Sequence, residues 1–187
     1  TELRIRDSVF ANAPRQQSPL PHLLYVGRIA RFELSGSRFQ NGYWGHLVKS
    51  RARISELRYN LIADGPSGEA SYAIDLPNGG EATLVGNIIE QSARPQNTTM
   101  VAYGAEGSGW PENTLSLAHN TIINHADQGF FVRLWPEGFP EIHPPRVLIR
   151  NNLTLGAGLQ TEGIPNDHGN NAHLDTPGPD EPEPDAL

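Results

Sequence analysis

A short side-chain pattern recurs six times along the chain and constrains the fold more than any other feature. Each copy has an alternating apolar run, one Ser or Asn, and a second apolar pair, and the polar residue returns every 23 to 33 residues. The aligned polar positions are Ser8, Ser37, Asn60, Asn87, Asn120 and Asn152. One such unit cannot bury its apolar face alone, whereas stacked units share a continuous core. The repeat therefore predicts a solenoid.

A second set of apolar runs lies between these copies, at residues 22–27, 46–51, 72–77, 100–105 and 130–135. Three of the runs lead directly into turns that contain Gly or Pro. Coils spaced about 4.8 Å apart can hydrogen-bond in parallel with their neighbours, and side-chain amides at a sharp turn can bond from coil to coil. We therefore predict an all-β, right-handed parallel β-helix of about six coils with an internal Asn/Ser ladder over residues 1–160.

An antiparallel sandwich is the competing fold, because it also has short strands and frequent turns. It would join its strands through two-residue hairpins and would have no reason to keep one polar column. The column favours the parallel β-helix.

The two ends of the chain differ from the repeats. Residues 161–187 are rich in Pro and acids, and we expect a tail that is flexible or draped on the body. The first repeat begins with the first residues, so we expect a fragment of a longer protein whose uncovered N-terminal edge permits oligomerisation. No apolar run is long enough to span a membrane, and the lack of cysteine excludes disulfides and thiolate sites.

The net charge of −7 comes largely from residues 165–187, which hold six acids and neither Lys nor Arg. The body is close to neutral, and we expect no nucleic-acid partner. Seven basic residues nevertheless cluster between positions 28 and 58, where Glu33 and Glu56 are the only acids. The cluster either forms a positive surface for an anionic ligand or consists of Arg stems that cover apolar surface and pair with nearby acids.

Stacking would align the second-strand residues into ladders on the outside of the solenoid. One such ladder is predicted to contain Tyr25, Lys49, Asp75, Tyr103 and Arg133. Tyrosine rings stack on sugar faces, and Lys, Asp and Arg bind or move protons. An ordinary solvated strand face would show the same alternation, so both interpretations stay open.

The repeat with its Asn column resembles the pectate lyase-like right-handed β-helix superfamily over about residues 1–160. Residues 45–92 are similar to the central coils of chondroitinase B and alginate lyase relatives, with a Lys-Ser pair, a "YN" coil and a "GN" turn. Uncharacterised bacterial right-handed β-helix region proteins are more similar still, and their motifs match His22–Ile29, Gly45–Ala52 and Pro77–Gly80.

The resemblance implies a catalytic lysine that removes a proton beside a uronate carboxylate, an arginine that assists the leaving group, and calcium that neutralises the carboxylate. Lys49 matches the base, and Arg51 and Arg53 are expected to lower its pKa. Asp75 takes the place of the arginine, and Gln40–Leu47 lacks the acids that bind calcium. The candidate catalytic residues are thus Lys49 and Asp75. We predict no cofactor apart from the calcium implied by the resemblance.

The predicted substrate-binding residues are Tyr25, His46, Arg51, Tyr103 and Arg133. His22 and His46 fall in register and could share a metal or flank a groove, but structural histidines satisfied by hydrogen bonds are the simpler interpretation. The three tryptophans (Trp44, Trp110 and Trp135) either line a sugar-binding face or pack under loops.

Two functions remain after these comparisons of pattern and chemistry. The first is a β-helix that binds, and as a lyase or epimerase modifies, an anionic polysaccharide along the exposed ladder, in an extracellular, periplasmic or cell-surface location. The second is a non-catalytic structural or adhesive solenoid.

Overall fold

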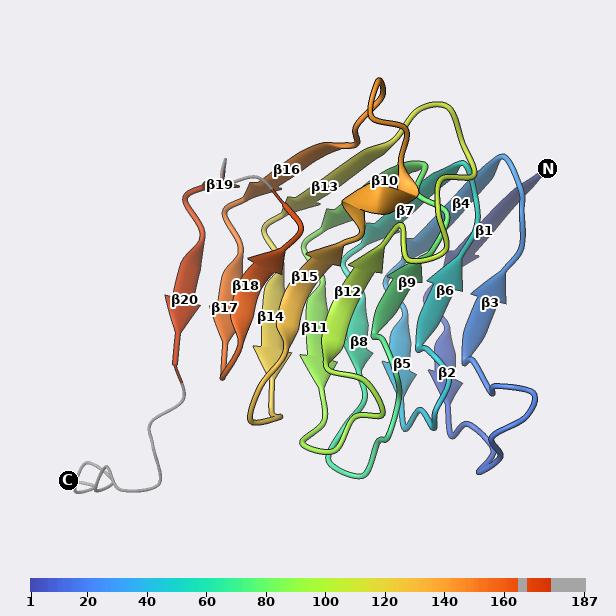
Figure 1. Cartoon of the computed structure of the whole chain (residues 1–187). Helices are drawn as coiled ribbons and strands as arrows, with labels where there is room; N and C mark the ends of the chain where they lie inside the picture. Colours follow the sequence, from blue (N-terminus) through green and yellow to red (C-terminus); the bar gives the residue numbers. More distant parts are fainter. Residues whose placement is uncertain (165–167, 176–187) are drawn as a thin grey trace.

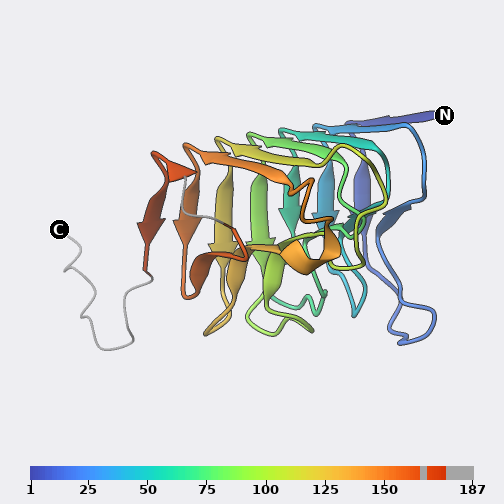
Figure 2. The same ribbon diagram turned by 45° about the horizontal axis from the view of Figure 1, so that its top comes forward.

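The computed structural model describes residues 1–164 and 168–175 and shows a parallel β-solenoid of about six turns (Figure 1). Each of the first six turns gives one strand to each of three sheets, which we name A, B and C, and β19 and β20 add a seventh strand to A and B. Every strand pair within the described residues is parallel, so the predicted β-helix is confirmed and the antiparallel sandwich is excluded. Figure 2 shows the turns stacked in order from the N-terminal to the C-terminal end.

Sheet A contains β1 (Glu2–Arg6), β4 (Arg31–Ser35), β7 (Ile54–Arg58), β10 (Glu81–Val85), β13 (Thr114–Ala118), β16 (Arg146–Arg150) and β19 (His168–Gly169). Sheet B contains β2 (Val9–Ala11), β5 (Arg38–Gln40), β8 (Leu61–Ala63), β11 (Ile88–Gln91), β14 (Thr121–Asn124), β17 (Leu153–Leu155) and β20 (Ala172–Leu174). Sheet C contains β3 (Leu24–Val26), β6 (Val48–Ser50), β9 (Ile74–Leu76), β12 (Thr99–Tyr103), β15 (Phe130–Leu134) and β18 (Leu159–Glu162). A single 3-10 turn, η1 (Pro136–Gly138), follows β15 in the described chain.

The core fills the space between the three sheets. In strands β4, β7, β10 and β13 of sheet A, every second residue is buried, as strand geometry requires when one face meets a core. Leu34, Leu57, Leu84 and Leu117 form one inward column that is at most 1% exposed. In-register stacking therefore places like side chains on like, and each added turn extends the same core.

The corner between sheets A and B has the same length and backbone conformation in every described turn. It has two residues, of which the first has a positive φ, for example Gly36 (60°) and Tyr59 (56°), and the second belongs to the polar column. The Oδ1 atoms of Asn87, Asn120 and Asn152 each accept the backbone N–H and the amide N–H of the ladder residue one coil earlier, at 2.9–3.0 Å. Buried polar groups require such partners, so the ladder is confirmed as a structural device.

The solenoid continues beyond the boundary predicted at residue 160. β18, β19 and β20 extend sheets C, A and B as far as Leu174. Asn171 adds a further rung, because its Oδ1 accepts the backbone and amide N–H groups of Asn152 at 2.9 and 3.0 Å. Residues 165–167 and 176–187 of the predicted acidic tail lie outside the described residues.

Within the described residues no helix has the length and hydrophobicity needed to cross a bilayer. At the opposite end from β20, strands β1, β2 and β3 are the first of their sheets. Association of copies through that edge stays a prediction.

Candidate functional site

The three outer faces of the solenoid differ in chemistry. Sheet A carries exposed ion pairs, such as Arg4 with Glu33 at 3.0 Å. Sheet B presents mainly aliphatic side chains, among them Val9 and Ile88, which are 69% and 45% exposed. Sheet C, at the front of Figure 1, combines aromatic and charged side chains. This is the face on which the sequence predicts the site.

The observed register brings together most of the predicted ladder. Tyr25 pairs with Lys49, and Lys49 pairs with Asp75. The next partners are Ala102, Arg133 and finally Glu162 of β18. Ala102 thus occupies the outward position predicted for Tyr103.

The placement of Tyr103 on the outer ladder is wrong by one residue. Tyr103 pairs with Leu76 and Leu134, and its side chain is fully buried. A shift of one residue moves a strand side chain to the opposite face of the sheet. The ring stacks on Phe139 with centroids 5.6 Å apart, and the hydroxyl donates to the carbonyl of Gly80 at 2.5 Å. Tyr103 therefore has no surface on which to bind a substrate.

Lys49 lies at the centre of an ion-pair network. Its Nζ donates to Asp75 Oδ2 and to Glu106 Oε1, each at 2.8 Å. The side chains of Lys49 and Asp75 are only 9% and 2% exposed. His46 Nε2 also lies 3.2 Å from Asp75 Oδ2, and Arg51 Nη2 donates to the second oxygen of Glu106 at 2.5 Å. Four predicted site residues thus converge, joined by one loop residue that the sequence did not indicate.

The guanidinium of Arg51 is held by three groups. In addition to its contact with Glu106, Nε donates to the hydroxyl of Tyr25 at 2.8 Å and Nη1 donates to the side chain of Asn78. The Tyr25 side chain is 53% exposed, and the guanidinium carbon lies 5.8 Å from its ring centroid. Trp110 donates to the carbonyl of Arg51, which assigns this tryptophan to loop packing. Arg51 is therefore fixed beside an accessible aromatic ring.

The protonation states follow from these contacts. Burial acts to lower the pKa of Lys49, but the charges and hydrogen bonds of Asp75 and Glu106 outweigh it, and the pKa lies above its ordinary value. The expectation that Arg51 and Arg53 lower the pKa is therefore wrong. Burial acts to raise the pKa of Asp75, but His46 and Lys49 hold it below its ordinary value. Lys49 is thus a cation that donates hydrogen bonds, and Asp75 is a carboxylate.

The two aligned histidines are tied into the backbone. His46 Nδ1 accepts the N–H of Tyr72 at 3.1 Å, and His22 Nδ1 accepts the N–H of His46 at 2.9 Å. We assign the proton of His46 to Nε2, which faces Asp75. Burial is the largest cause that lowers the pKa of His22 to about 4, and the positive charge of Lys49 acts in the same direction. Both Nδ1 atoms accept backbone N–H groups and His46 Nε2 faces Asp75, so the contacts of the pair fit the structural interpretation.

Aromatic rings continue the site along the solenoid axis. The rings of His46 and Tyr72 stack with centroids 4.7 Å apart, and Trp135 lies 6.3 Å from Tyr72. The guanidinium of Arg133 lies 4.7 Å from the Trp135 ring centroid, and Arg133 Nε lies 3.0 Å from Glu162 Oε2. We call this set from His46 to Arg133 the aromatic row. It links the ionic network to the C-terminal turns of sheet C.

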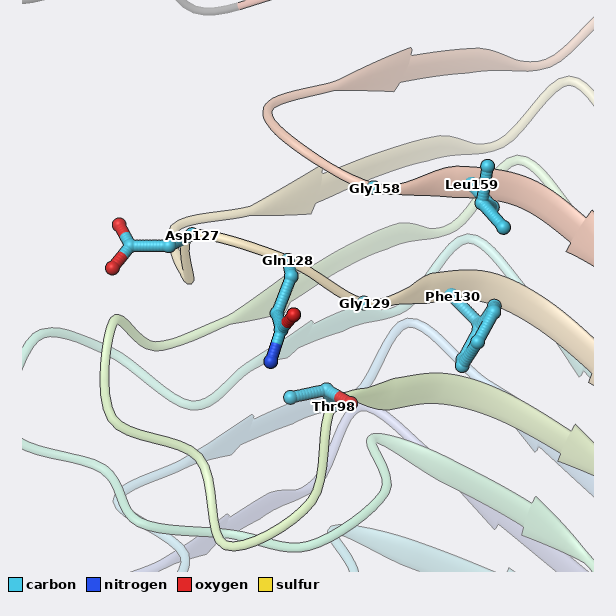
Figure 3. A pocket seen from close by; sticks show the side chains of 7 residues that line it. All are labelled: Thr98, Asp127, Gln128, Gly129, Phe130, Gly158 and Leu159. Carbon is cyan, nitrogen blue, oxygen red and sulfur yellow. The ribbon is translucent and has the colours of Figure 1, made fainter.

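An open pocket of about 500 Å³ lies beyond the row, where the chain enters β12, β15 and β18 (Figure 3). It is lined by Thr98, Asp127, Gln128, Gly129, Phe130, Gly158 and Leu159. In Figure 3 the side chain of Gln128 points toward Thr98, whereas Asp127 points away. Arg133 also lies 5.0 Å from the ring centroid of Phe130, so the pocket adjoins the aromatic row.

The calcium that the resemblance implies does not fit these residues. The acids of the face are each matched with a basic side chain: Asp75 with Lys49, Glu106 with Lys49 and Arg51, and Glu162 with Arg133. In the described part of the chain, no group of three or more His, Asp or Glu side chains is arranged to hold a metal.

No described protein family, curated protein or solved structure with which the chain was compared matches it. The strand pairing shows the β-solenoid fold, and no family is assigned to the chain.

Sequence reasoning missed Glu106, Tyr72 and Asn78. Glu106 lies in the loop after β12, and its contact with Lys49 spans 57 residues with no local pattern to indicate it. Tyr72 could have been found, because it precedes Ile74 as His46 precedes Val48 and therefore belongs to the same column. Loop residues lack the period of two that identifies strand neighbours.

Proposed function

We propose that the outer face of sheet C binds an acidic polysaccharide whose chain lies along the solenoid axis. The observation that carries this proposal is the continuous succession of Tyr25, the ionic network and the aromatic row across the strands of one face. Ring surfaces contact the apolar faces of sugars, and Arg and Lys bind carboxylates. The resemblance to pectate lyase-like proteins supports the same ligand class and an extracellular, periplasmic or cell-surface location.

Binding is better supported than cleavage. A lysine with a raised pKa is protonated near neutral pH and cannot remove the proton beside a uronate carboxylate. Asp75 occupies the position at which the resemblance calls for an arginine, and it anchors Lys49 rather than facing solvent. A lyase or epimerase reaction would first require Lys49 to lose a carboxylate partner.

The proposal is tested by titrating the protein with oligosaccharides of polygalacturonate, alginate and glycosaminoglycans in a calorimeter. Arg133→Gln should weaken binding by about tenfold, because one charge-assisted hydrogen bond is lost. Arg146→Gln is the matched control on sheet A, and we expect it to leave the affinity unchanged. Absence of binding to every uronate polymer would remove the proposal. Ultraviolet absorbance of an unsaturated product would instead reveal lyase activity.

A structural or adhesive solenoid is the second candidate, and one observation favours it. Lys49, Arg51 and Arg133 are each paired with an acid of the chain itself, so none of these three cations needs a ligand for charge balance. Under this alternative, Arg133→Gln changes stability slightly and changes binding to no glycan.

A further inference from the structure

The ionic network contains an arrangement of donors built around one carboxylate. Lys49 Nζ and Arg51 Nη2 approach the two oxygens of Glu106 separately, at 2.8 and 2.5 Å. We call Lys49 and Arg51 the carboxylate clamp. Two charged donors that engage both oxygens of one carboxylate provide geometric selectivity as well as attraction.

Each member of the clamp also has partners other than Glu106. Lys49 is also held by Asp75, which is 2% exposed, and Arg51 is also held by Tyr25 and Asn78. Ordered donors that do not depend on the ligand reduce the entropy cost of binding.

Glu106 is the accessible member of the network. Its side chain is 45% exposed, against 9% for Lys49 and 24% for Arg51. It extends from a turn closed by the hydrogen bond from Gly107 N–H to the Gly104 carbonyl, and its own N–H bonds the carbonyl of Pro77. The carboxylate thus reaches the clamp from the solvent side, while its backbone is anchored elsewhere.

We propose that the carboxylate clamp is a binding site for the carboxylate of a uronate residue, and that Glu106 occupies it when no ligand is bound. The inference rests on the proposed function of the sheet C face and assigns a specific subsite to it. On binding, the uronate carboxylate replaces Glu106 on Lys49 and Arg51, and the sugar ring lies against Tyr25. The exchange leaves the net charge at Lys49 and Arg51 unchanged, since one carboxylate replaces another there.

The test compares wild type with Glu106→Ala and with Glu106→Gln, which keeps the size of the side chain. A competing internal group lowers apparent affinity by the fraction of time it occupies the site, so its removal should raise affinity for oligouronates roughly tenfold. A neutral oligosaccharide should gain nothing. Glu141→Ala is the matched control, because it removes the same charge from an exposed residue of the corresponding loop in the next turn, which follows β15. Arg51→Gln added to Glu106→Ala should abolish the gain.

The outcomes separate this inference from the proposed function. If wild type and both Glu106 variants bind oligouronates equally, the face binds glycans and the clamp assignment is wrong. A gain shared by Glu141→Ala also overturns it, because general charge then explains the effect. Binding seen only in the Glu106 variants supports the inference. If no variant binds, both proposals fail.

Discussion

The Asn ladder and the ionic network are both lines of polar side chains that run from coil to coil, yet they are built on opposite principles. Every rung of the ladder from Asn60 onward is the same residue with the same partners. The network instead joins unlike residues from two strands, a turn and a loop.

The difference follows from charge. An amide is both donor and acceptor, so identical amides can stack through any number of coils. Identical charges about 4.8 Å apart would repel one another at every step. A charged column must therefore alternate in sign or borrow a partner from a loop, and this face does both. Further coils can consequently continue the ladder with the same residue. The network cannot be continued in this way, because each of its charges has a specific partner of opposite charge.

The largest effect is expected from Asp75→Ala. Removal of one partner from a buried ion pair costs about 3–5 kcal/mol, and the lower end applies because Lys49 keeps Glu106. Denaturant unfolding measures the loss, with the exposed Asp127→Ala as control. The double variant Lys49→Met/Asp75→Ala should recover most of the stability, because no unpaired charge is left buried. A double variant as unstable as the single one would contradict this account.

Asn87→Ala should cost about 3 kcal/mol, since it leaves the N–H of Asn60 and the carbonyl of Leu57 without their partners. The measurement is again denaturant unfolding. Gln128→Ala serves as the control, because it truncates an exposed amide. Equal losses in the two variants would show that the ladder contributes little stability.

A smaller effect is expected from His22 as pH changes. Its pKa is lowered to about 4 in the folded protein, so the unfolded state binds the proton more readily. The contribution of His22 is complete above pH 6.5 and is lost as the pH falls from about 6.5 to 4, by on the order of 2 kcal/mol allowing for partial exposure. Unfolding curves of wild type and His22→Gln should converge in this range. The exposed His143→Gln should follow wild type throughout.

The smallest effect is expected where charges are exposed. Arg53 pairs with Glu81 at 3.2 Å, and both side chains are about 40% exposed. Arg53→Gln should therefore cost about 0.5 kcal/mol and lose even that at high salt. A loss as large as that of Asp75→Ala would remove the contrast between buried and exposed pairs. Thermal unfolding at two salt concentrations tests this.

The fold could be predicted from the sequence because every A-to-B corner is two residues long and ends in the same kind of side chain. The neighbour relation of Lys49 and Asp75 followed from the same regularity. Asn171 was within reach as well, since Asn170-Asn171-Ala172 repeats the pattern Asn151-Asn152-Leu153. Tyr103 was misplaced because burial of a hydroxyl depends on a distant acceptor, the Gly80 carbonyl. Glu106 could not be found because loop length and path carry no period.

The two-residue corner has a consequence for how such a chain can change length. From one ladder residue to the next the chain takes 19 to 33 residues, and this variation lies outside the A-to-B corner, for example in the loop of Glu106. Insertions there leave every rung aligned, whereas one extra residue between sheets A and B would turn a whole strand inside out. The A-to-B corner thus has a fixed length, whereas the two other corners tolerate inserted segments. New recognition loops can therefore be placed beside sheet C without redesigning the scaffold.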